Sequence, residues 1–260
     1  MSDNPLPPES SASMPLLAHL LEARKRLVNS AIAFAIAFGI CFYFAQNILN
    51  FLIRPLKTLP ENMAVTQMLM TSVTEGFATN IRIAMWSGLC LAFPFIMTQI
   101  WLFVAPGLYR TERRAFYPFL IATPILFLLG ASLVYYMILP LALKFLASFQ
   151  THGDATTIAI VLQPKISEYL SFMLRLIFAF GLSFELPVLL TLLARVGIVN
   201  SQGLISKRRY AIVAIFAFAA VVTPPDVTSQ IALAVPMMIL YELSIFSVKF
   251  VERKKLNKNQ

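Results

Sequence analysis

The sequence predicts an all-α membrane protein that crosses the bilayer six times, and three observations lead to this prediction. Hydrophobic residues make up 58% of the 260 residues and charged residues only 13%, with a mean hydropathy of +0.76. A soluble globular domain is usually about half apolar and about a quarter charged. Several charge-free intervals exceed the ~20 residues that a helix needs to cross a bilayer. The Lys and Arg residues also gather in alternate connections, which is typical of membrane proteins with a fixed orientation.

The start of the chain is polar and rich in proline. Residues 1–18 contain four prolines and a Ser-rich patch, so we expect a disordered lead-in. They lack the charged stretch, apolar run and small-residue cleavage site of a signal peptide. Leucines at helical spacing around 19–27 predict an amphipathic helix on the membrane surface. The membrane domain is expected to cover 19–248, and residues 249–260 form a basic tail.

Long intervals without charge predict the first three spans. Residues 27–53 and 83–109 contain 27 uncharged residues each, and 115–143 contains 29. A fourth span is expected from Pro164 to Ala194, because proline suits the first turn of a helix and glycine, here at position 197, suits its end.

The fifth and sixth spans are predicted to be short. Two adjacent prolines, Pro224 and Pro225, precede Asp226 and prevent one helix from running through this segment. The charge-free runs on either side, 210–225 and 227–241, contain 16 and 15 residues. At 1.5 Å per residue each covers only ~24 Å, less than the ~30 Å of the hydrocarbon layer. We therefore expect a tight hairpin whose short helices thin the bilayer or end beneath a protein-lined cavity.

The distribution of positive charge predicts the orientation. Six spans place both termini on one side, and 15 of the 21 Lys and Arg residues lie in segments on that side. Four lie in the connections on the other side, and Arg82 and Arg175 lie within spans. Both termini are therefore expected in the cytoplasm, and the longer loops 47–73 and 148–164 on the opposite side. The orientation also accounts for the net charge of +9 without a nucleic-acid partner.

Glu185 is an acidic residue near the middle of the predicted fourth span. An ionised carboxylate that faced lipid there would be strongly unfavourable, so the group is expected to be neutral, paired or facing a water-filled cavity. Pro187 is expected to break the helix here. Two interpretations stay open. The carboxyl group could bond a backbone carbonyl or a hydroxyl beside this break, or it could form a functional polar site in a cavity.

Two further glutamates lie in segments predicted to be cytoplasmic. Glu22 is four residues before Arg26, a spacing that favours a solvated ion pair on a helix. Glu112 stands directly before Arg113 and Arg114, which could neutralise it. From the local pattern alone, neither glutamate can be assigned a function.

The chain shows no pattern of an enzyme. The motifs of serine hydrolases, zinc proteases and nucleotide-binding loops are missing from it. Its two cysteines, Cys41 and Cys90, and its two histidines do not stand at metal-binding spacing. We therefore expect no catalytic residue, no metal and no cofactor.

Several motifs taken together resemble the TatC family, the multi-spanning signal-receptor subunit of the twin-arginine protein translocase. They extend from about His19 to Glu242. Each motif alone is moderately specific for the family, but their occurrence together in the same order is strongly specific. In chain order they are HLLEARKRL (19–27), the Pro55 region, FPFIMTQIWLFVAPGLYRTERR (93–114), FGLSFELPV (180–188), KRRY (207–210), VTPPDVTSQ (222–230) and VPMMILYE (235–242). Ala23 departs from the leucine usual in the family, and Arg82 replaces a lysine.

The resemblance implies a function without bond-making chemistry. TatC-like proteins recognise the paired arginines of a signal peptide at the cytoplasmic face of the bacterial inner membrane. With single-span TatA and TatB partners, and with other TatC copies, they pass folded proteins across the membrane, driven by the proton-motive force. By position, Glu22 and Glu112 would receive the two arginines, beside Arg24 and Phe103.

The resemblance also implies further sites. The helices would form a concave cup, along which the hydrophobic part of the signal lies toward Glu185. Ala220 and Thr223 on the fifth span, together with Gln230, would contact TatB or TatA.

Two other classes of function are weighed against this one. A proton-coupled transporter of small solutes would use Glu185 as its relay, but such transporters commonly show internal repeats, and none is visible here. A purely structural scaffold would need none of the three glutamates Glu22, Glu112 and Glu185.

Overall fold

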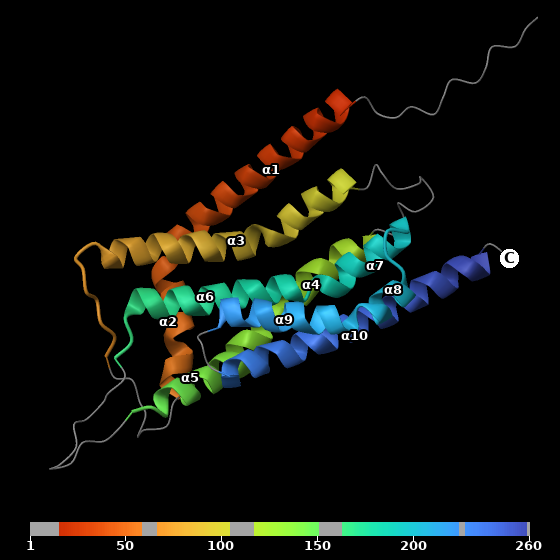
Figure 1. Ribbon diagram of the computed structural model, residues 1–260. Coiled ribbons are helices and arrows are strands. Elements are labelled where there is room, and N and C mark those ends of the chain that lie inside the picture. The colour runs from red at the N-terminus through yellow and green to blue at the C-terminus, as the bar shows by residue number, and fades with distance from the viewer. Residues whose placement is uncertain (1–15, 59–66, 105–116, 151–162, 224–226, 259–260) are drawn as a thin grey trace, which may run out of the picture.

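The computed structural model of the chain describes residues 16–58, 67–104, 117–150, 163–223 and 227–258 (Figure 1). Within these ranges every regular element is a helix, apart from one isolated β-bridge between Leu69 and Lys165. Five of the described helices are long and apolar enough to span a membrane. The predicted all-α architecture with several membrane helices is therefore confirmed, while the count of six spans stays a prediction.

The first helix, α1 (Leu16–Tyr43), is longer than predicted. It runs without interruption through 19–27, the segment expected to form an amphipathic helix on the membrane surface, and on through the predicted first span. The two are one helix because residues 16–38 contain no proline or glycine that could end it. The chain then turns into α2 (Ala45–Ile53) and the short 3₁₀ helix η1 (Arg54–Thr58). Part of the predicted loop 47–73 is thus helical.

The predicted second and third spans are present as α3 (Glu75–Val104) and α4 (Tyr117–Leu133). The third span continues through one π-helical turn, η5 (Val134–Ile138), into α5 (Leu139–Ala147). The π turn is wider than an α-helical turn and lies beside α2. Within it Tyr135 is buried, whereas its neighbour Tyr136 is exposed.

The fourth span is divided into α6 (Ile166–Ser183) and α7 (Leu186–Val196). Glu185 lies at the junction, and Pro187 occupies the first turn of α7. The break near Pro187 is therefore confirmed. Gly197 ends α7 with φ of 85°, a left-handed conformation that glycine adopts without strain.

The last helices are α8 (Ser201–Ser206), α9 (Arg208–Val222) and α10 (Val227–Lys258). With 15 residues, α9 is short, as predicted. The predicted short sixth helix is wrong, because α10 contains 32 residues and continues into the expected tail. Glu242, which ends the charge-free interval, is exposed and pairs with Arg208 at 2.7 Å, so its charge does not interrupt the helix.

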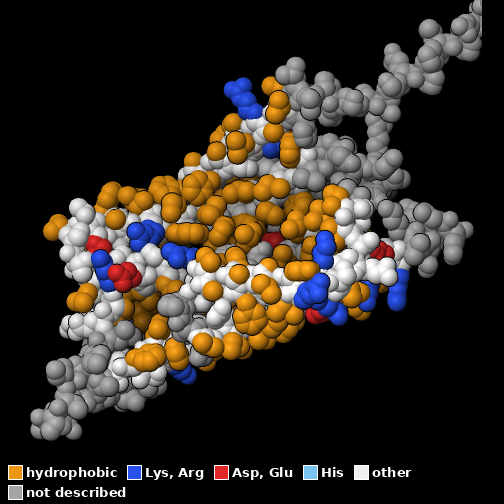
Figure 2. Space-filling view, in the orientation of Figure 1, with side chains coloured by type: hydrophobic (Ala, Val, Ile, Leu, Met, Phe, Trp, Pro, Cys, Tyr) orange, Lys and Arg blue, Asp and Glu red, His pale blue; other side chains and the backbone are white. Residues whose placement is uncertain are grey.

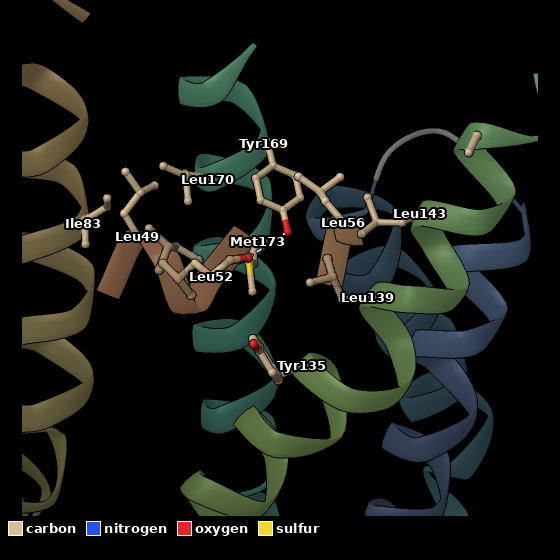
Figure 3. Close-up of a cluster of buried hydrophobic side chains, with 12 residues drawn as sticks. Leu49, Leu52, Leu56, Ile83, Tyr135, Leu139, Leu143, Tyr169, Leu170 and Met173 are labelled. Carbon is tan, nitrogen blue, oxygen red and sulfur yellow. Dashed lines mark hydrogen bonds between the residues drawn. The ribbon is translucent and has the colours of Figure 1, made fainter. Parts of the chain in front are cut away.

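Both described ends of the chain lie at the same end of the molecule, which we call the terminal end (Figure 1). The opposite end contains α2, η1 and α5, and we call it the distal end. A buried apolar cluster at the distal end joins these three elements to α3 and α6 (Figure 3). Tyr169 and Tyr135 anchor it by donating to the carbonyls of Leu52 and Phe51 at 2.9 and 2.8 Å.

Much of the outer surface is apolar (Figure 2). On α1, for example, Ile32, Ile36 and Ile40 recur every four residues and are all about half exposed or more. A soluble monomer rarely exposes apolar patches of this extent. The surface therefore fits a hydrocarbon environment.

Candidate functional site

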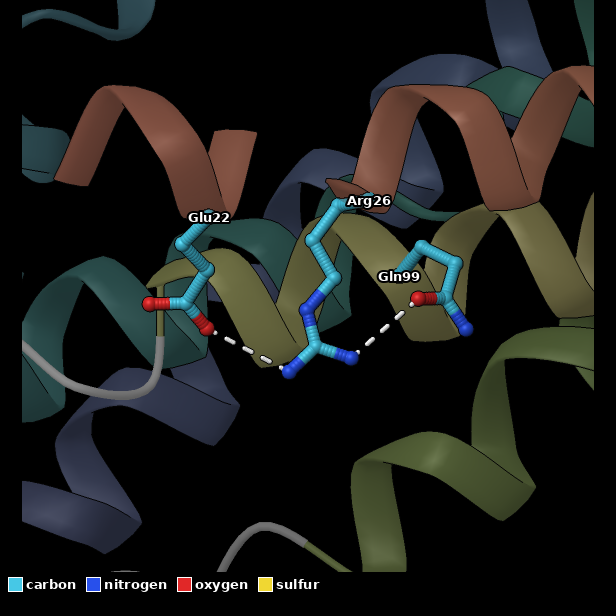
Figure 4. Close-up of polar contacts among 3 residues, drawn as sticks. All are labelled: Glu22, Arg26 and Gln99. Carbon is cyan, nitrogen blue, oxygen red and sulfur yellow. Dashed lines mark hydrogen bonds and ion pairs between the residues drawn. The ribbon is translucent and has the colours of Figure 1, made fainter. Parts of the chain in front are cut away.

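A polar contact between α1 and α3 lies toward the terminal end of the molecule (Figure 4). Arg26 donates from Nη2 to Oε1 of Glu22 at 3.3 Å and from Nη1 to Oε1 of Gln99 at 3.2 Å. The side chains of Arg26 and Glu22 are 28% and 22% exposed. The ion pair foreseen from the i,i+4 spacing is therefore present, and Gln99 is an additional member from the neighbouring helix.

The geometry of α1 and α3 produces this contact. Glu22 and Arg26 are one turn apart on an uninterrupted helix, so they lie on the same face. Pro94 lies inside α3 and favours a bend there. In Figure 1 the last part of α3 bends and runs alongside α1, which brings Gln99 within reach of Arg26.

A cavity of about 390 Å³ lies next to this contact, between α1 and α3. Arg24 and Phe103, both singled out in the sequence, line it together with Arg26 and Gln99. Its other walls are mainly aliphatic: Ala23, Leu27, Ser30, Ile96 and Ile100. The structure therefore brings Glu22, Arg24 and Phe103 into one region, with apolar surface available beside the charges.

Glu112 lies in 105–116, outside the described residues. The segment follows directly after Val104, at the end of α3 that also carries Gln99 and Phe103. Its position near Glu22 stays a prediction.

Glu185 is buried between helices, with 4% of its surface exposed. Neither carboxyl oxygen has a hydrogen bond to a described residue. The Thr123 hydroxyl on α4 is close enough to interact with the carboxyl group, although the two do not meet the geometry of a hydrogen bond. The first interpretation from sequence was a bond to a backbone carbonyl or a hydroxyl, and neither bond is present in the described part of the chain.

The residues expected to contact partners lie around α9. Ala220 is exposed, whereas Thr223 is buried and donates from its hydroxyl to the Ala219 carbonyl at 2.9 Å. Gln230 on α10 donates to the Phe216 carbonyl of α9 at 3.1 Å. Two of the three side chains therefore bond within the chain.

The predicted structural prolines are only partly described. Pro55 is buried in the first turn of η1, next to Leu56 of the distal cluster. Pro224, Pro225 and Asp226 lie outside the described residues. In the described ranges no group of three or more His, Cys, Asp or Glu residues could hold a metal ion.

A second polar network was not foreseen from the sequence. Glu75, at the start of α3, is buried and accepts bonds from the Thr71 amide at 2.6 Å and the Ser167 hydroxyl at 2.6 Å. About two turns further along α3, Arg82 donates to the Ser167 carbonyl at 3.1 Å and to the Ser171 hydroxyl. The network fastens α3 to α6 and explains how Arg82 is accommodated within a span.

Gln99, Ser167 and Ser171 share a reason for being missed. They are uncharged, whereas the spans and sites were predicted from the positions of charged residues. A polar uncharged residue inside an apolar interval would have been the signal, because such a group needs a partner there.

Comparison with known proteins gives one consistent result. The family model described as Sec-independent protein translocase protein (TatC) matches residues 18–236. A protein of Magnetococcus marinus with the same name is 45% identical over 93% of this chain and 86% of its own length. The corresponding protein of Aquifex aeolicus is 41% identical over 93% and 98%, and that of Escherichia coli K12 is 39% identical over 95% and 93%.

A solved structure is also similar. A crystal structure titled as the twin arginine translocase receptor TatC superposes with a TM-score of 0.77 at 39% sequence identity. The match covers 90% of this chain and 99% of the solved one.

Proposed function

The chain belongs to the TatC family of Sec-independent protein translocase proteins, and from this premise we propose how it acts as the receptor subunit of the twin-arginine translocase. Twin-arginine signal peptides of folded precursor proteins bind at the terminal end of the molecule. Glu22 and Glu112 accept the two guanidinium groups, and Arg24 and Phe103 complete the site. The single observation that carries this proposal is the cavity between α1 and α3, which lies beside Glu22 and is lined by Arg24 and Phe103.

The chemistry of the residues fits this ligand. A carboxylate can accept two parallel hydrogen bonds from one guanidinium group, so two arginines are best bound by two separate carboxylates. The cations Arg24 and Arg26 line the cavity and would disfavour a compact ammonium group that could not form such paired bonds.

In the free protein Glu22 is paired with Arg26. When the signal binds, Glu22 must either release Arg26 or bind Arg26 and the signal arginine together. A partly exposed ion pair contributes only about 0–1 kcal/mol. A ligand arginine that binds bidentately can therefore displace it. Gln99 keeps one bond to Arg26 when Glu22 turns to the ligand.

The rest of the complex follows from the family. The hydrophobic part of the signal lies along a concave apolar face and reaches toward Glu185. TatA and TatB type single-span subunits, and other TatC copies, assemble around the six-span chain in the bacterial inner membrane, with both termini in the cytoplasm. Transport is driven by the proton-motive force, and the chain itself is not an enzyme.

The contact with single-span partners is placed on α9. Its outward side exposes Val213 and Val221 at 68% and 77%, on the same helix as Ala220. Because Gln230 on α10 bonds to the Phe216 carbonyl of α9, we assign it the role of holding the two helices together while the exposed apolar side meets the partner helix. Thr223 bonds to the Ala219 carbonyl within α9, and we assign it the role of closing the last turn of that helix.

Crosslinking in membranes tests the signal site. A twin-arginine signal peptide that carries a photoreactive group is incubated with the full chain and with the variants Glu22→Gln and Glu112→Gln. Each variant is expected to lower the yield about tenfold, the effect of losing one charge-assisted pair. A signal with two lysines should crosslink as poorly to the unchanged chain.

Glu242→Gln is the matched control, since Glu242 is an exposed glutamate paired with an arginine outside the cavity. It should leave the yield unchanged. If the double variant Glu22→Gln with Glu112→Gln crosslinks as well as the unchanged chain, the site is placed wrongly.

A further inference from the structure

A small pocket at the distal end is formed where η1 meets the π turn η5 and α5. It has a volume of about 250 Å³ and is lined by Phe51, Arg54, Pro55, Tyr135, Tyr136 and Pro140. The elements that form it, α2, η1 and α5, lie at the distal end, opposite the terminal end (Figure 1). Signal recognition as proposed above does not use it.

The walls of the pocket are held by several contacts. The rings of Phe51 and Tyr135 stack with centroids 4.4 Å apart and planes 2° from parallel. The Tyr135 hydroxyl donates to the Phe51 carbonyl at 2.8 Å. Pro55 and Pro140 have restricted backbones on the two sides. The pocket is therefore largely preformed.

Arg54 supplies a positive charge at the rim. Its guanidinium carbon lies 5.8 Å from the centre of the Phe51 ring, a distance typical of a cation–π contact. The side chain is exposed, and within the described residues no carboxylate lies within ion-pair distance of it. None of the described carboxylates therefore occupies its donors.

The π turn determines which of two tyrosines is exposed at the pocket. Consecutive residues point in different directions there: Tyr135 is 8% exposed, while Tyr136 is 73% exposed, and their rings meet edge to face at 4.9 Å. Tyr136 therefore lines the pocket and also reaches its exposed surface. Its hydroxyl is a second donor at the pocket.

Other exposed side chains mark the depth of this pocket in the bilayer. Tyr43 ends α1 at 83% exposure, and Tyr136 in the pocket is itself 73% exposed. Tyrosine rings gather at the level of the lipid head groups. Met137 and Leu141, next to the pocket-lining residues on η5 and α5, are 70% and 46% exposed and form an apolar track there.

We propose that this pocket binds the phosphate group of a phospholipid from the leaflet at the distal end. Arg54 and the Tyr136 hydroxyl donate to the phosphate oxygens, and one acyl chain lies along Met137 and Leu141. A membrane phospholipid is the occupant that fits all of these features, because free phosphate would use the two donors but not the apolar track. The inference is independent of how the signal peptide is bound.

Native mass spectrometry of the full chain, purified in detergent and stripped of lipid, tests the proposal. Phosphatidylglycerol is added in defined amounts, and the fraction of chain with one bound lipid is measured. Arg54→Gln is expected to weaken the first binding event about tenfold and Tyr136→Phe severalfold. Lys57→Gln is the matched control, because Lys57 is an exposed cation on the same short helix but does not line the pocket.

Two further arms identify the ligand. Dioleoylglycerol, which has acyl chains but no phosphate, should bind weakly to every variant, and inorganic phosphate in large excess should not displace the lipid. Equal losses in Arg54→Gln and Lys57→Gln would mean general attraction to positive charge and would overturn the proposal. Displacement by inorganic phosphate would replace the lipid site with a simple anion site. Should Arg54→Gln fail to fold, Tyr136→Phe still decides, since an unchanged affinity in that variant contradicts the proposed contact.

Discussion

Arg26 contacts both a glutamate that the proposed function uses and a polar side chain of the next helix. In the absence of a signal peptide, its guanidinium group occupies one oxygen of Glu22, at 3.3 Å. A signal arginine and Arg26 therefore compete for the same carboxylate. The local ion pair that made Glu22 look like an ordinary surface residue is thus part of the proposed site.

This competition predicts the effect of Arg26→Gln. Removing the internal cation leaves Glu22 unpaired in the free protein, so the affinity for a twin-arginine peptide should rise by up to about fivefold, the equivalent of the ~1 kcal/mol that such a pair contributes. Titration of a labelled peptide against the purified chain measures this. Gln99→Leu, which leaves the Glu22–Arg26 pair in place, is the control and should change the affinity much less. A clear loss of affinity in Arg26→Gln would instead show that Arg26 positions Glu22 for the ligand.

A second prediction at this scale concerns Glu185. Its carboxyl group is almost fully buried and has no hydrogen bond within the described residues. An unsatisfied buried polar group lowers stability by about 1–3 kcal/mol. We therefore expect Glu185→Leu to raise the thermal unfolding midpoint in detergent while it impairs transport. Thr191→Val on α7 is the control: its hydroxyl already bonds the Pro187 carbonyl, so no gain in stability is expected. A lower midpoint for Glu185→Leu would mean that the carboxyl group makes a stabilising contact.

At the scale of helices, charge-free intervals predicted where spans exist better than where helices end. Pro187 and Gly197 predicted the break and the end around α7, because both act on the backbone itself. Charges act only through solvation, and a helix can continue past a charge that reaches water or a partner. This is why α10 continues beyond Glu242, and why the expected surface helix proved to be the beginning of α1.

The close contact between α1 and α3 could not be predicted from the sequence. A methyl group added to Gly88 on α3 would lie 2.9 Å from the backbone Cα of Phe38 on α1. The two helices are thus in close backbone contact there, and Arg26 and Gln99 are carried by the same pair of helices. No local pattern indicates which glycine faces a neighbouring helix.

Gly88→Ala should therefore destabilise the chain by about 1–3 kcal/mol, the usual effect of overpacking against atoms that cannot move aside. By pushing α1 away from α3, it should also weaken signal binding. Gly39→Ala on α1 is the control, because a methyl group there meets nothing within 4 Å. We expect it to be neutral or slightly stabilising, since alanine favours a helix over glycine by about 1 kcal/mol. Chemical denaturation in mixed micelles compares the two, and equal effects would contradict the close contact.

At the scale of the whole molecule, the polar groups divide between the two ends. The Glu22 site and the Arg208–Glu242 pair lie toward the terminal end, and the Glu75–Arg82 network and the Arg54 pocket lie toward the distal end. The network adds to the β-bridge of Leu69 in tying the start of α3 to the start of α6. From hydropathy and charge, the sequence predicted that the chain is a membrane protein and divided its loops into a basic set and a less basic set. It could not supply the contacts of Arg26 with Gln99 and of Glu75 with Ser167, because each joins residues more than seventy positions apart.

The last prediction concerns the orientation of the whole chain. Both described ends of the chain lie at one end of the molecule, and 15 of 21 cations lie in segments assigned to that side. Since cytoplasmic connections retain Lys and Arg, alkaline phosphatase fused after Gln260 should be inactive in bacterial cells, and green fluorescent protein fused there should fluoresce. Inserted after Gln150, which follows α5 at the distal end, the two reporters should behave in the opposite way. Active phosphatase at Gln260 would reverse the orientation, place Glu22 outside the cytoplasm and remove the basis for signal recognition there.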